Sequence, residues 1–176
     1  LKVAGAVTAT PKADVPSVEK KVKENTKADG ETAYGPGYND VADYNIGDTV
    51  PFSLIGTIPI HRTDYPKYSY TFHDEVSAGL SIDTSSIKVY LVSAKSETTG
   101  TDVTSSFEAN TTADSFTLNC TNIDDLAGIT GATYIRVNYN ATLNENANIG
   151  LPGNKNDVYL TFSNNPHADY SGEKHP

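Results

Sequence analysis

Apolar and polar residues alternate along most of this chain with a period of two, and stretches with a helical period are scarce. Such alternation is typical of strands, because successive side chains of a strand point to opposite faces. Gly, Pro, Asn and Ser bound the alternating stretches and mark turns between them. The predicted strands are Val15–Val22, Thr49–Ile58, Tyr68–Asp74, Ser86–Val92, Ser115–Cys120, Ala132–Leu143 and Val158–Asn164.

Short strands at this spacing, without helices between them, predict an all-β fold, an antiparallel β-sandwich of immunoglobulin-like type. The Cys…Trp…Cys pattern of antibody domains is missing, since the chain has one cysteine and no tryptophan. We expect the sandwich to span residues 15–166. Residues 1–14 are expected to form an N-terminal extension or an edge strand, and residues 167–176 a linker or tail to a next domain.

The chain is acidic, with 22 Asp and Glu against 13 Lys and Arg and a formal net charge of −9. This charge argues against a nucleic-acid partner, which requires a basic face. No apolar run approaches about 18 residues, so we expect no membrane span. The single cysteine excludes an internal disulfide, and the four histidines lack ligand spacing, so no metal and no cofactor are expected.

Three polar residues stand in rows that the alternation assigns to the core: Lys20, Asp74 and Asn164. Burial disfavours charge, so a buried lysine tends to become a neutral amine and a buried carboxyl tends to stay protonated. A neutral amine is a nucleophile, and a protonated carboxyl polarises an amide carbonyl by donating a hydrogen bond to its oxygen. Held together in a dry interior, such groups can form a Lys–Asn isopeptide bond with loss of ammonia.

The same three residues also fit a fold without this chemistry. Lys20 has the pattern of a lysine at a strand end whose stem lies along apolar surface. Asp74 precedes Ser77 and Gly79, as a residue that starts a turn does, and Asn164 stands in a turn-forming Ser-Asn-Asn-Pro. Alternation alone favours this second interpretation.

Three segments of the sequence, taken together, resemble a known family. They are Ala42–Phe52 with its Ile-Gly-Asp turn, Tyr70–Leu80 with Asp-x-x-Ser-x-Gly-Leu, and Asn156–Pro166 with its terminal Ser-Asn-Asn-Pro. In this order they are similar to the D2-type, CnaA-like domain of the sortase-assembled backbone pilins of Gram-positive bacteria. The resemblance runs from about Val15 to Pro166 and implies a CnaA-type sandwich that forms an intramolecular isopeptide bond.

The resemblance implies roles for particular residues. The bond-forming lysine of the family matches Lys20, and its asparagine matches Asn164, with Asn165 as the fallback. The catalytic acid of the family matches Asp74, while Glu145 is the weaker candidate because it lies in a loop. The implied apolar surround consists of Phe52, Tyr70, Phe72 and Phe162.

The resemblance further implies a structural shaft domain of a cell-surface pilus rather than an enzyme. Its only reaction would be the autocatalytic, single-turnover formation of the isopeptide bond. The implied partners are other pilin subunits, joined covalently by sortase. The implied location is extracellular, in a pilus anchored to the cell wall. The chain contains no sorting signal, so we expect it to be one domain of a longer subunit.

The alternative function is that of a surface adhesin domain. Such a domain would bind a host protein or glycan, its receptor, through loops such as 25–39 or 95–114. An exposed aromatic cluster at Tyr34, Tyr38 and Tyr44 would favour this alternative. An enzyme acting on an external substrate has no motif in its support.

Overall fold

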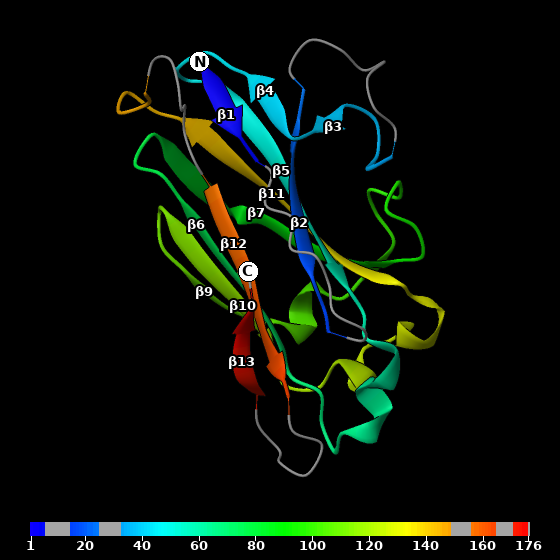
Figure 1. Cartoon of the computed structure of the whole chain (residues 1–176). Helices are drawn as coiled ribbons and strands as arrows, with labels where there is room; N and C mark the ends of the chain where they lie inside the picture. Colours follow the sequence, from blue (N-terminus) through cyan, green and yellow to red (C-terminus); the bar gives the residue numbers. More distant parts are fainter. Residues whose placement is uncertain (6–14, 25–32, 149–155, 165–170, 176) are drawn as a thin grey trace.

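The computed structural model describes residues 1–5, 15–24, 33–148, 156–164 and 171–175, most of which form two antiparallel sheets packed face to face (Figure 1). The spatial order of the six-stranded sheet is β3 (Tyr38–Asn39), β2 (Val18–Lys23), β5 (Thr49–Thr57), β11 (Tyr134–Leu143), β7 (Leu80–Val92) and β8 (Thr101–Asp102). The order of the five-stranded sheet is β13 (Ser171–His175), β12 (Asn156–Ser163), β6 (Tyr70–Val76), β10 (Ser115–Cys120) and β9 (Glu108–Thr111).

The predicted all-β, antiparallel sandwich is confirmed, and most predicted strands lie within a few residues of their expected bounds. The largest difference is in β7, which begins at Leu80 rather than Ser86. A register irregularity between Asn138 and Asn140 of β11 faces the polar residues 83–86 of β7, so the strand continues through a segment without alternation. Residues Ile123–Asp125 form a single 3₁₀ turn, η3.

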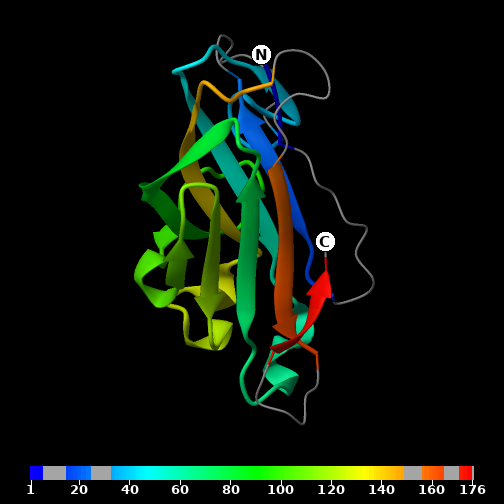
Figure 2. The same cartoon turned by 90° about the vertical axis from the view of Figure 1, so that its left-hand side faces the viewer.

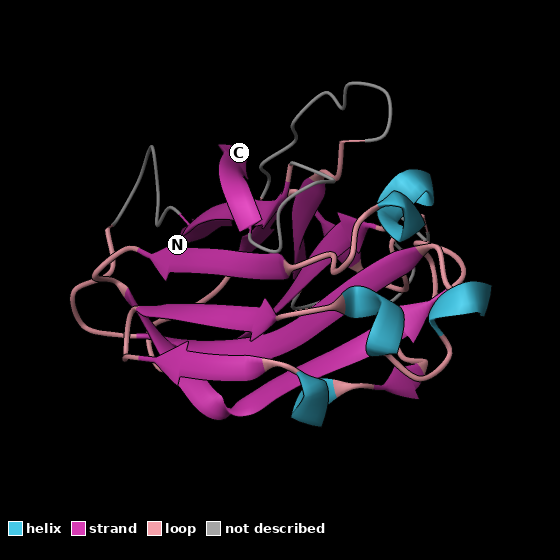
Figure 3. Ribbon diagram, turned by 90° about the horizontal axis from the view of Figure 1, so that it is seen from below, coloured by secondary structure: helices cyan, strands magenta, loops and turns pink. Residues whose placement is uncertain are grey.

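The two ends of the described chain both add strands. β1 (Lys2–Ala4) pairs with β4 (Val41–Asp43) in a separate two-stranded sheet. β13 pairs with β12, so part of the segment predicted to be a linker extends the five-stranded sheet. The remaining 3₁₀ turns, η1 (Ile60–Asp64), η2 (Thr104–Ser106) and η4 (Ile129–Gly131), lie with η3 toward one end of the sandwich (Figure 3).

The core fills the space between the sheets with the inward rows of both. Gly56 of β5 illustrates how closely they approach, because a Cβ at this position would lie 2.3 Å from the Tyr70 hydroxyl of the opposite sheet. This contact allows Tyr70 to donate a hydrogen bond to the Thr57 carbonyl at 2.9 Å. Other fully buried members of the core include Val22, Phe52, Phe72, Val137 and Leu160.

Strands β2 and β12 belong to different sheets but lie side by side along one flank of the sandwich (Figure 2). One comes early in the chain and the other late, so side chains distant in sequence meet in the same part of the core. In the part of the chain that the structure describes, no helix has the length and apolar character to cross a membrane.

Candidate functional site

Lys20 of β2 and Asp74 of β6 reach each other from opposite sheets. The Lys20 Nζ atom lies 2.5 Å from Asp74 Oδ1, and neither side chain has any solvent exposure. The alternation explains their placement, because Lys20 continues the inward row of Val18 and Val22. Taking a lysine and an aspartate out of water costs several kcal/mol per ion, so stabilisation of the fold alone does not account for this pair.

Two further polar side chains complete the cluster. Asn156 of β12 donates a hydrogen bond from Nδ2 to the Tyr139 hydroxyl at 2.8 Å, and the same hydroxyl of Tyr139, on β11, interacts with the carboxyl of Asp74. We call Lys20, Asp74, Tyr139 and Asn156 the buried quartet. Each sheet supplies two of its members, so the quartet connects the sheets through the core.

Two oxygen atoms of the quartet lack a hydrogen-bond partner among the described residues. They are Asp74 Oδ2 and Asn156 Oδ1, and both are buried. An unsatisfied buried acceptor costs about 1–3 kcal/mol, and native structures rarely tolerate one without a reason. A proton on Asp74 would give this carboxyl a donor that a neighbouring carbonyl oxygen can accept.

Aromatic rings surround the lysine. The Lys20 Nζ atom lies 5.0 Å from the centre of the Phe52 ring and 5.4 Å from that of Tyr139. These two rings stack on each other with their centres 5.4 Å apart, and Phe116 meets Tyr139 edge to face at 5.0 Å. The rings exclude water and hold the Tyr139 hydroxyl in place.

The burial of the pair changes the protonation of both partners. Desolvation lowers the pKa of Lys20 to about 8, although the Asp74 carboxylate opposes this shift. Desolvation also raises the pKa of Asp74 against the opposing effect of Lys20. Both shifts favour transfer of one proton from the ammonium to the carboxylate, which leaves a neutral amine beside a carboxylic acid. A nucleophile, an acid and a carboxamide therefore occupy one water-excluded site.

The structure does not bring Asn164 into this site. β12 ends at Ser163, and Asn164 is exposed to solvent. The β6–β12 register places Val158 opposite Asp74, and Asn164 lies six residues further, about 20 Å along an extended strand. The prediction that Asn164 faces the dry interior is therefore wrong, and Asn156 supplies the buried carboxamide. Asn165, the fallback for Asn164, lies outside the described residues.

Glu145, the weaker candidate acid, is also not in the site. It lies in the turn that follows β11, whose last residue is Leu143, and its side chain is exposed. The inward row of β11 ends with the strand, so shared parity with Leu143 does not carry Glu145 into the core. Asp74 is the carboxyl that the structure places beside Lys20.

The four predicted apolar residues, Phe52, Tyr70, Phe72 and Phe162, are all buried. Only Phe52 among them lies over the Lys20 amine. Phe162 pairs with Tyr70, four residues along β12 from the level of Asp74, so both contribute to the core away from the quartet.

The sequence interpretation missed Tyr139, Phe116 and Asn156. Asn156 shares the parity of Val158 and Leu160, so extending the inward row by one step toward the N-terminus would have found it.

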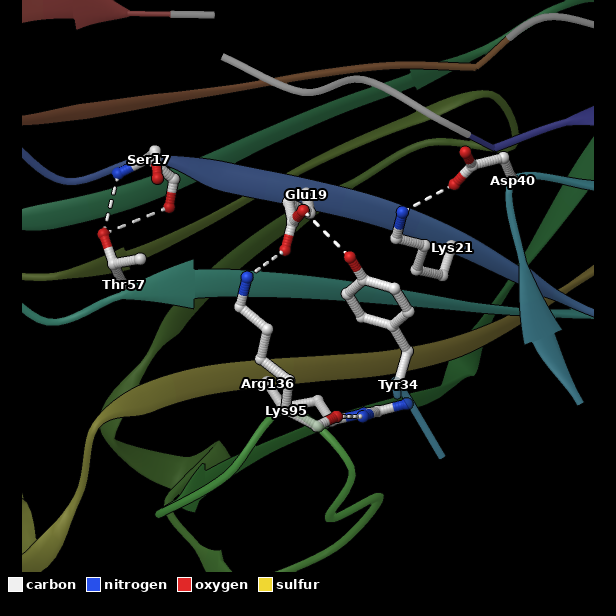
Figure 4. Close-up of polar contacts among 8 residues, drawn as sticks. All are labelled: Ser17, Glu19, Lys21, Tyr34, Asp40, Thr57, Lys95 and Arg136. Atoms are coloured by element: carbon white, nitrogen blue, oxygen red, sulfur yellow. Dashed lines mark hydrogen bonds and ion pairs between the residues drawn. The ribbon is translucent and has the colours of Figure 1, made fainter. Parts of the chain in front are cut away.

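The outer face of the six-stranded sheet carries a second polar network (Figure 4). Lys21 of β2 points away from the core, forms an ion pair with Asp40 at 2.5 Å and lies 4.1 Å from the centre of the Tyr34 ring. Tyr34 also donates a hydrogen bond to Glu19, which binds Lys95 at 2.8 Å. Tyr34 is thus engaged in the network.

The exposed aromatic cluster that would favour an adhesin does not form. Tyr38 and Tyr44 are buried, with 7% and 4% of their surfaces exposed, and Tyr34 is half-buried. Within the described ranges, no group of three or more His, Cys, Asp or Glu side chains is arranged to hold a metal ion.

The fold matches solved structures of pilus subunits. The pilus backbone protein RrgB of Streptococcus pneumoniae is 20% identical with a TM-score of 0.57, over 86% of this chain and 54% of that one. The T6 backbone pilin of Streptococcus pyogenes is 20% identical with a TM-score of 0.59, over 92% and 33%. The major pilin GBS80 of Streptococcus agalactiae is 19% identical with a TM-score of 0.57, over 92% and 55%. The chain thus spans about half or less of each of these structures.

The sequence itself identifies the family. Residues 46–166 match the family described as Gram-positive pilin backbone subunit 2, Cna-B-like domain, and the chain belongs to it. The resemblance to a backbone pilin domain is thereby confirmed, although the family description is Cna-B-like where the sequence motifs favoured a CnaA-like type. No curated protein sequence matches the chain significantly.

Proposed function

We propose that this chain is a structural domain of a pilus shaft, in which Lys20 and Asn156 form an intramolecular isopeptide bond with the help of Asp74. Membership of the backbone pilin family supports the structural role. The single observation that carries the bond is the burial of the Lys20 amine against Asp74, with the Asn156 carboxamide joined to the same carboxyl through Tyr139.

The reaction uses groups that the quartet already holds. Asp74 takes a proton from Lys20, and the neutral amine attacks Cγ of Asn156. The protonated carboxyl of Asp74 donates a hydrogen bond to Asn156 Oδ1, which draws electron density from Cγ and stabilises the developing oxyanion. The Nζ–Cγ bond forms, the Cγ–Nδ2 bond breaks, and ammonia leaves. Asp74 keeps the proton that it took from the Lys20 ammonium, so the protons balance with ammonia as the leaving group.

Positioning of the reactants and exclusion of water lower the activation barrier. Holding reactants together in a packed core can lower the barrier by about 7–11 kcal/mol relative to free reactants. The walls formed by Phe52, Phe116 and Tyr139 keep out water, whose attack on the same carbonyl would give hydrolysis instead.

The bond would join β2, early in the chain, to β12, late in the chain. It closes a loop from residue 20 to residue 156, and force applied at the ends would pass through the bond without unravelling the strands between. A disulfide that closes a loop of about 100 residues stabilises a fold by about 5 kcal/mol through the unfolded state, and an isopeptide bond acts on chain entropy in the same way. This suits a subunit that carries tension.

The mass of the intact chain tests the proposal. We expect the folded protein to be lighter than its sequence by one ammonia molecule, and Lys20→Ala and Asn156→Ala to have their full sequence masses. Asn164→Ala is the matched control, because Asn164 is an exposed asparagine that directly follows the same strand, β12. A wild-type chain with its full mass would defeat the proposal, and loss of the bond in Asn164→Ala would return the role to that residue.

The surroundings of the domain follow from the same family. We place the domain in a longer subunit on the cell surface, with other pilin subunits as its partners in a polymer. No external substrate is assigned to it, because its reactive groups lie in the core and face one another.

A further inference from the structure

The Tyr139 hydroxyl lies between the acid and the leaving group of the proposed reaction. It accepts a hydrogen bond from Asn156 Nδ2 at 2.8 Å, and it interacts with the carboxyl of Asp74. Its side chain is almost fully buried, and its ring is fixed by the stack on Phe52 and the edge contact with Phe116. A hydroxyl in this position is both an acceptor toward one partner and a donor toward the other.

We propose that Tyr139 is a catalytic residue that relays the proton from Asp74 to the departing nitrogen of Asn156. This inference rests on the proposed Lys20–Asn156 bond and adds the step by which ammonia leaves. Attack by Lys20 alone does not complete the reaction, because an amide nitrogen departs only after it has gained a proton.

The relay balances without any other reactant. In the planar amide, Asn156 Nδ2 only donates hydrogen bonds. Once the amine of Lys20 has added to Cγ, this nitrogen becomes tetrahedral and regains a lone pair. Lys20 Nζ then gives one proton to Asp74, Asp74 gives one to the Tyr139 oxygen, and Tyr139 gives its own to Nδ2. Ammonia leaves, Tyr139 recovers its hydroxyl, and Asp74 keeps the proton that it took from the Lys20 ammonium before the attack.

The position of the tyrosine in its strand is consistent with a specific task. Tyr139 stands between Asn138 and Asn140, where the register between β11 and β7 shifts. Irregularities of this kind re-aim a side chain and are common beside reactive sites. A phenylalanine would fill the same core space, so packing alone does not require the hydroxyl.

Tyr139→Phe tests the relay, because it keeps the ring and removes only the hydroxyl. Chain isolated unfolded from inclusion bodies and held in urea is diluted into buffer, and intact mass is followed with time. General acid–base catalysis contributes about 10²–10⁴-fold, so we expect cross-linking to be at least about 10²-fold slower than in the wild-type chain. Tyr70→Phe is the matched control, since it removes another fully buried hydroxyl, which donates to the Thr57 carbonyl outside the quartet.

Two further measurements distinguish a proton relay through Tyr139 from a merely structural role of this residue. The thermal midpoints of Asp74→Ala and Asp74→Ala/Tyr139→Phe, neither of which cross-links, report whether the phenylalanine disturbs the fold. Difluorotyrosine at position 139, whose phenol is more acidic, changes proton transfer but keeps the hydroxyl. We expect it to restore cross-linking with a rate different from that of tyrosine.

Each outcome is decisive. A Tyr139→Phe chain that cross-links as fast as wild type overturns the relay, as does a difluorotyrosine chain with the rate of tyrosine, which would leave Tyr139 a positioning residue. A wild-type chain that never loses ammonia instead removes the proposed function itself, so the two failures are distinguishable.

Discussion

Asp74 and Asn156 are diagonal neighbours on the inner face of the five-stranded sheet, because Val158 lies opposite Asp74 and Asn156 is the next inward residue of β12. Side chains in such a relationship are within reach of each other. Each has one buried oxygen without a partner among the described residues. A proton on Asp74 would satisfy both atoms at once, and the same proton would activate the Asn156 carbonyl toward Lys20.

Asp74→Asn should abolish the cross-link. Asparagine keeps the shape of the side chain and its place beside Lys20, but it cannot accept the proton of the ammonium. We expect the intact mass to be that of the full sequence. The variant should also unfold at lower temperature, since an unpaired buried charge costs about 3–5 kcal/mol.

The control for Asp74→Asn is Glu75→Gln, which neutralises the adjacent, exposed carboxylate on the outer face of β6. This variant should lose ammonia as the wild type does. A cross-link that persists in Asp74→Asn, or disappears in Glu75→Gln, would contradict the role of Asp74 as the assisting acid.

Loss of the bond alone should lower stability through the unfolded state. We expect Asn156→Ala to unfold about 10–20 °C below the cross-linked wild type, since about 5 kcal/mol of loop-closure stabilisation is lost and each kcal/mol shifts the midpoint by about 2–4 °C in a domain of this size. Calorimetry measures the midpoint. Asn164→Ala should unfold within a few degrees of wild type, and equal midpoints for the two variants would speak against a covalent staple at residue 156.

The sequence predicts the site well where a residue lies inside a strand, and poorly where it lies at a strand end. Lys20 lies in the inward row of Val18 and Val22, and Asp74 continues the inward row of Tyr70 and Phe72. Both side chains are buried in the core, as the alternation indicates. Alternation does not report where a strand stops. β12 ends at Ser163, one residue before Asn164, and the inward row of Val158 and Leu160 does not reach that asparagine.

The sequence does not identify Asn156 and Tyr139 as site residues, for two different reasons. Asn156 is the first residue of β12 and follows a segment rich in Asn and Gly, so composition assigns it to a loop. Tyr139 falls in the inward row of β11 by alternation, and its ring is buried there. Only the meeting of two sheets reveals that its hydroxyl lies between Asp74 and Asn156, because sheet pairing is a property of tertiary structure.

The neighbouring lysine provides a sharp contrast of environment. Lys21, whose side chain is only 5% exposed, binds Asp40, whose side chain is 61% exposed, so water reaches and screens this ion pair from the Asp40 side. We expect Asp40→Ala to change the free energy of unfolding by no more than about 1 kcal/mol and to leave the cross-link intact. Chemical denaturation and intact mass measure the two effects. If Asp40→Ala prevented the loss of ammonia, the outer network would have a part in the reaction that the structure does not suggest.

Substitution of Arg136 should lower the free energy of unfolding far more than Asp40→Ala does. It is fully buried on β11, and its guanidinium donates to the carbonyls of Lys95 and Glu97 and to the Ser53 hydroxyl. Arg136→Met leaves these acceptors without donors, at about 1–3 kcal/mol for each one that stays buried. We expect a loss of several kcal/mol in urea unfolding, with the cross-link still forming in the folded fraction.

The matched comparison for Arg136→Met is Arg136→Lys, which retains the charge. A single ammonium cannot reproduce the forked geometry of the guanidinium, so part of the loss should remain. Full recovery by lysine would indicate that charge alone, rather than the geometry of the donors, holds residues 95–97 against the sheet.

The rate of cross-linking should depend on pH through the proton that Lys20 and Asp74 share. Burial lowers the pKa of Lys20 to about 8 and raises that of Asp74, so near neutral pH the pair retains one proton and contains both amine and acid in its reactive form. As pH rises through about 8 the pair loses this proton, which leaves a neutral amine beside a carboxylate that can no longer donate to the Asn156 carbonyl. We therefore expect the rate, followed by intact mass after dilution from urea, to fall above this pH. A rate that instead keeps rising would mean that deprotonation of the amine is the only requirement and that Asp74 does not act as an acid.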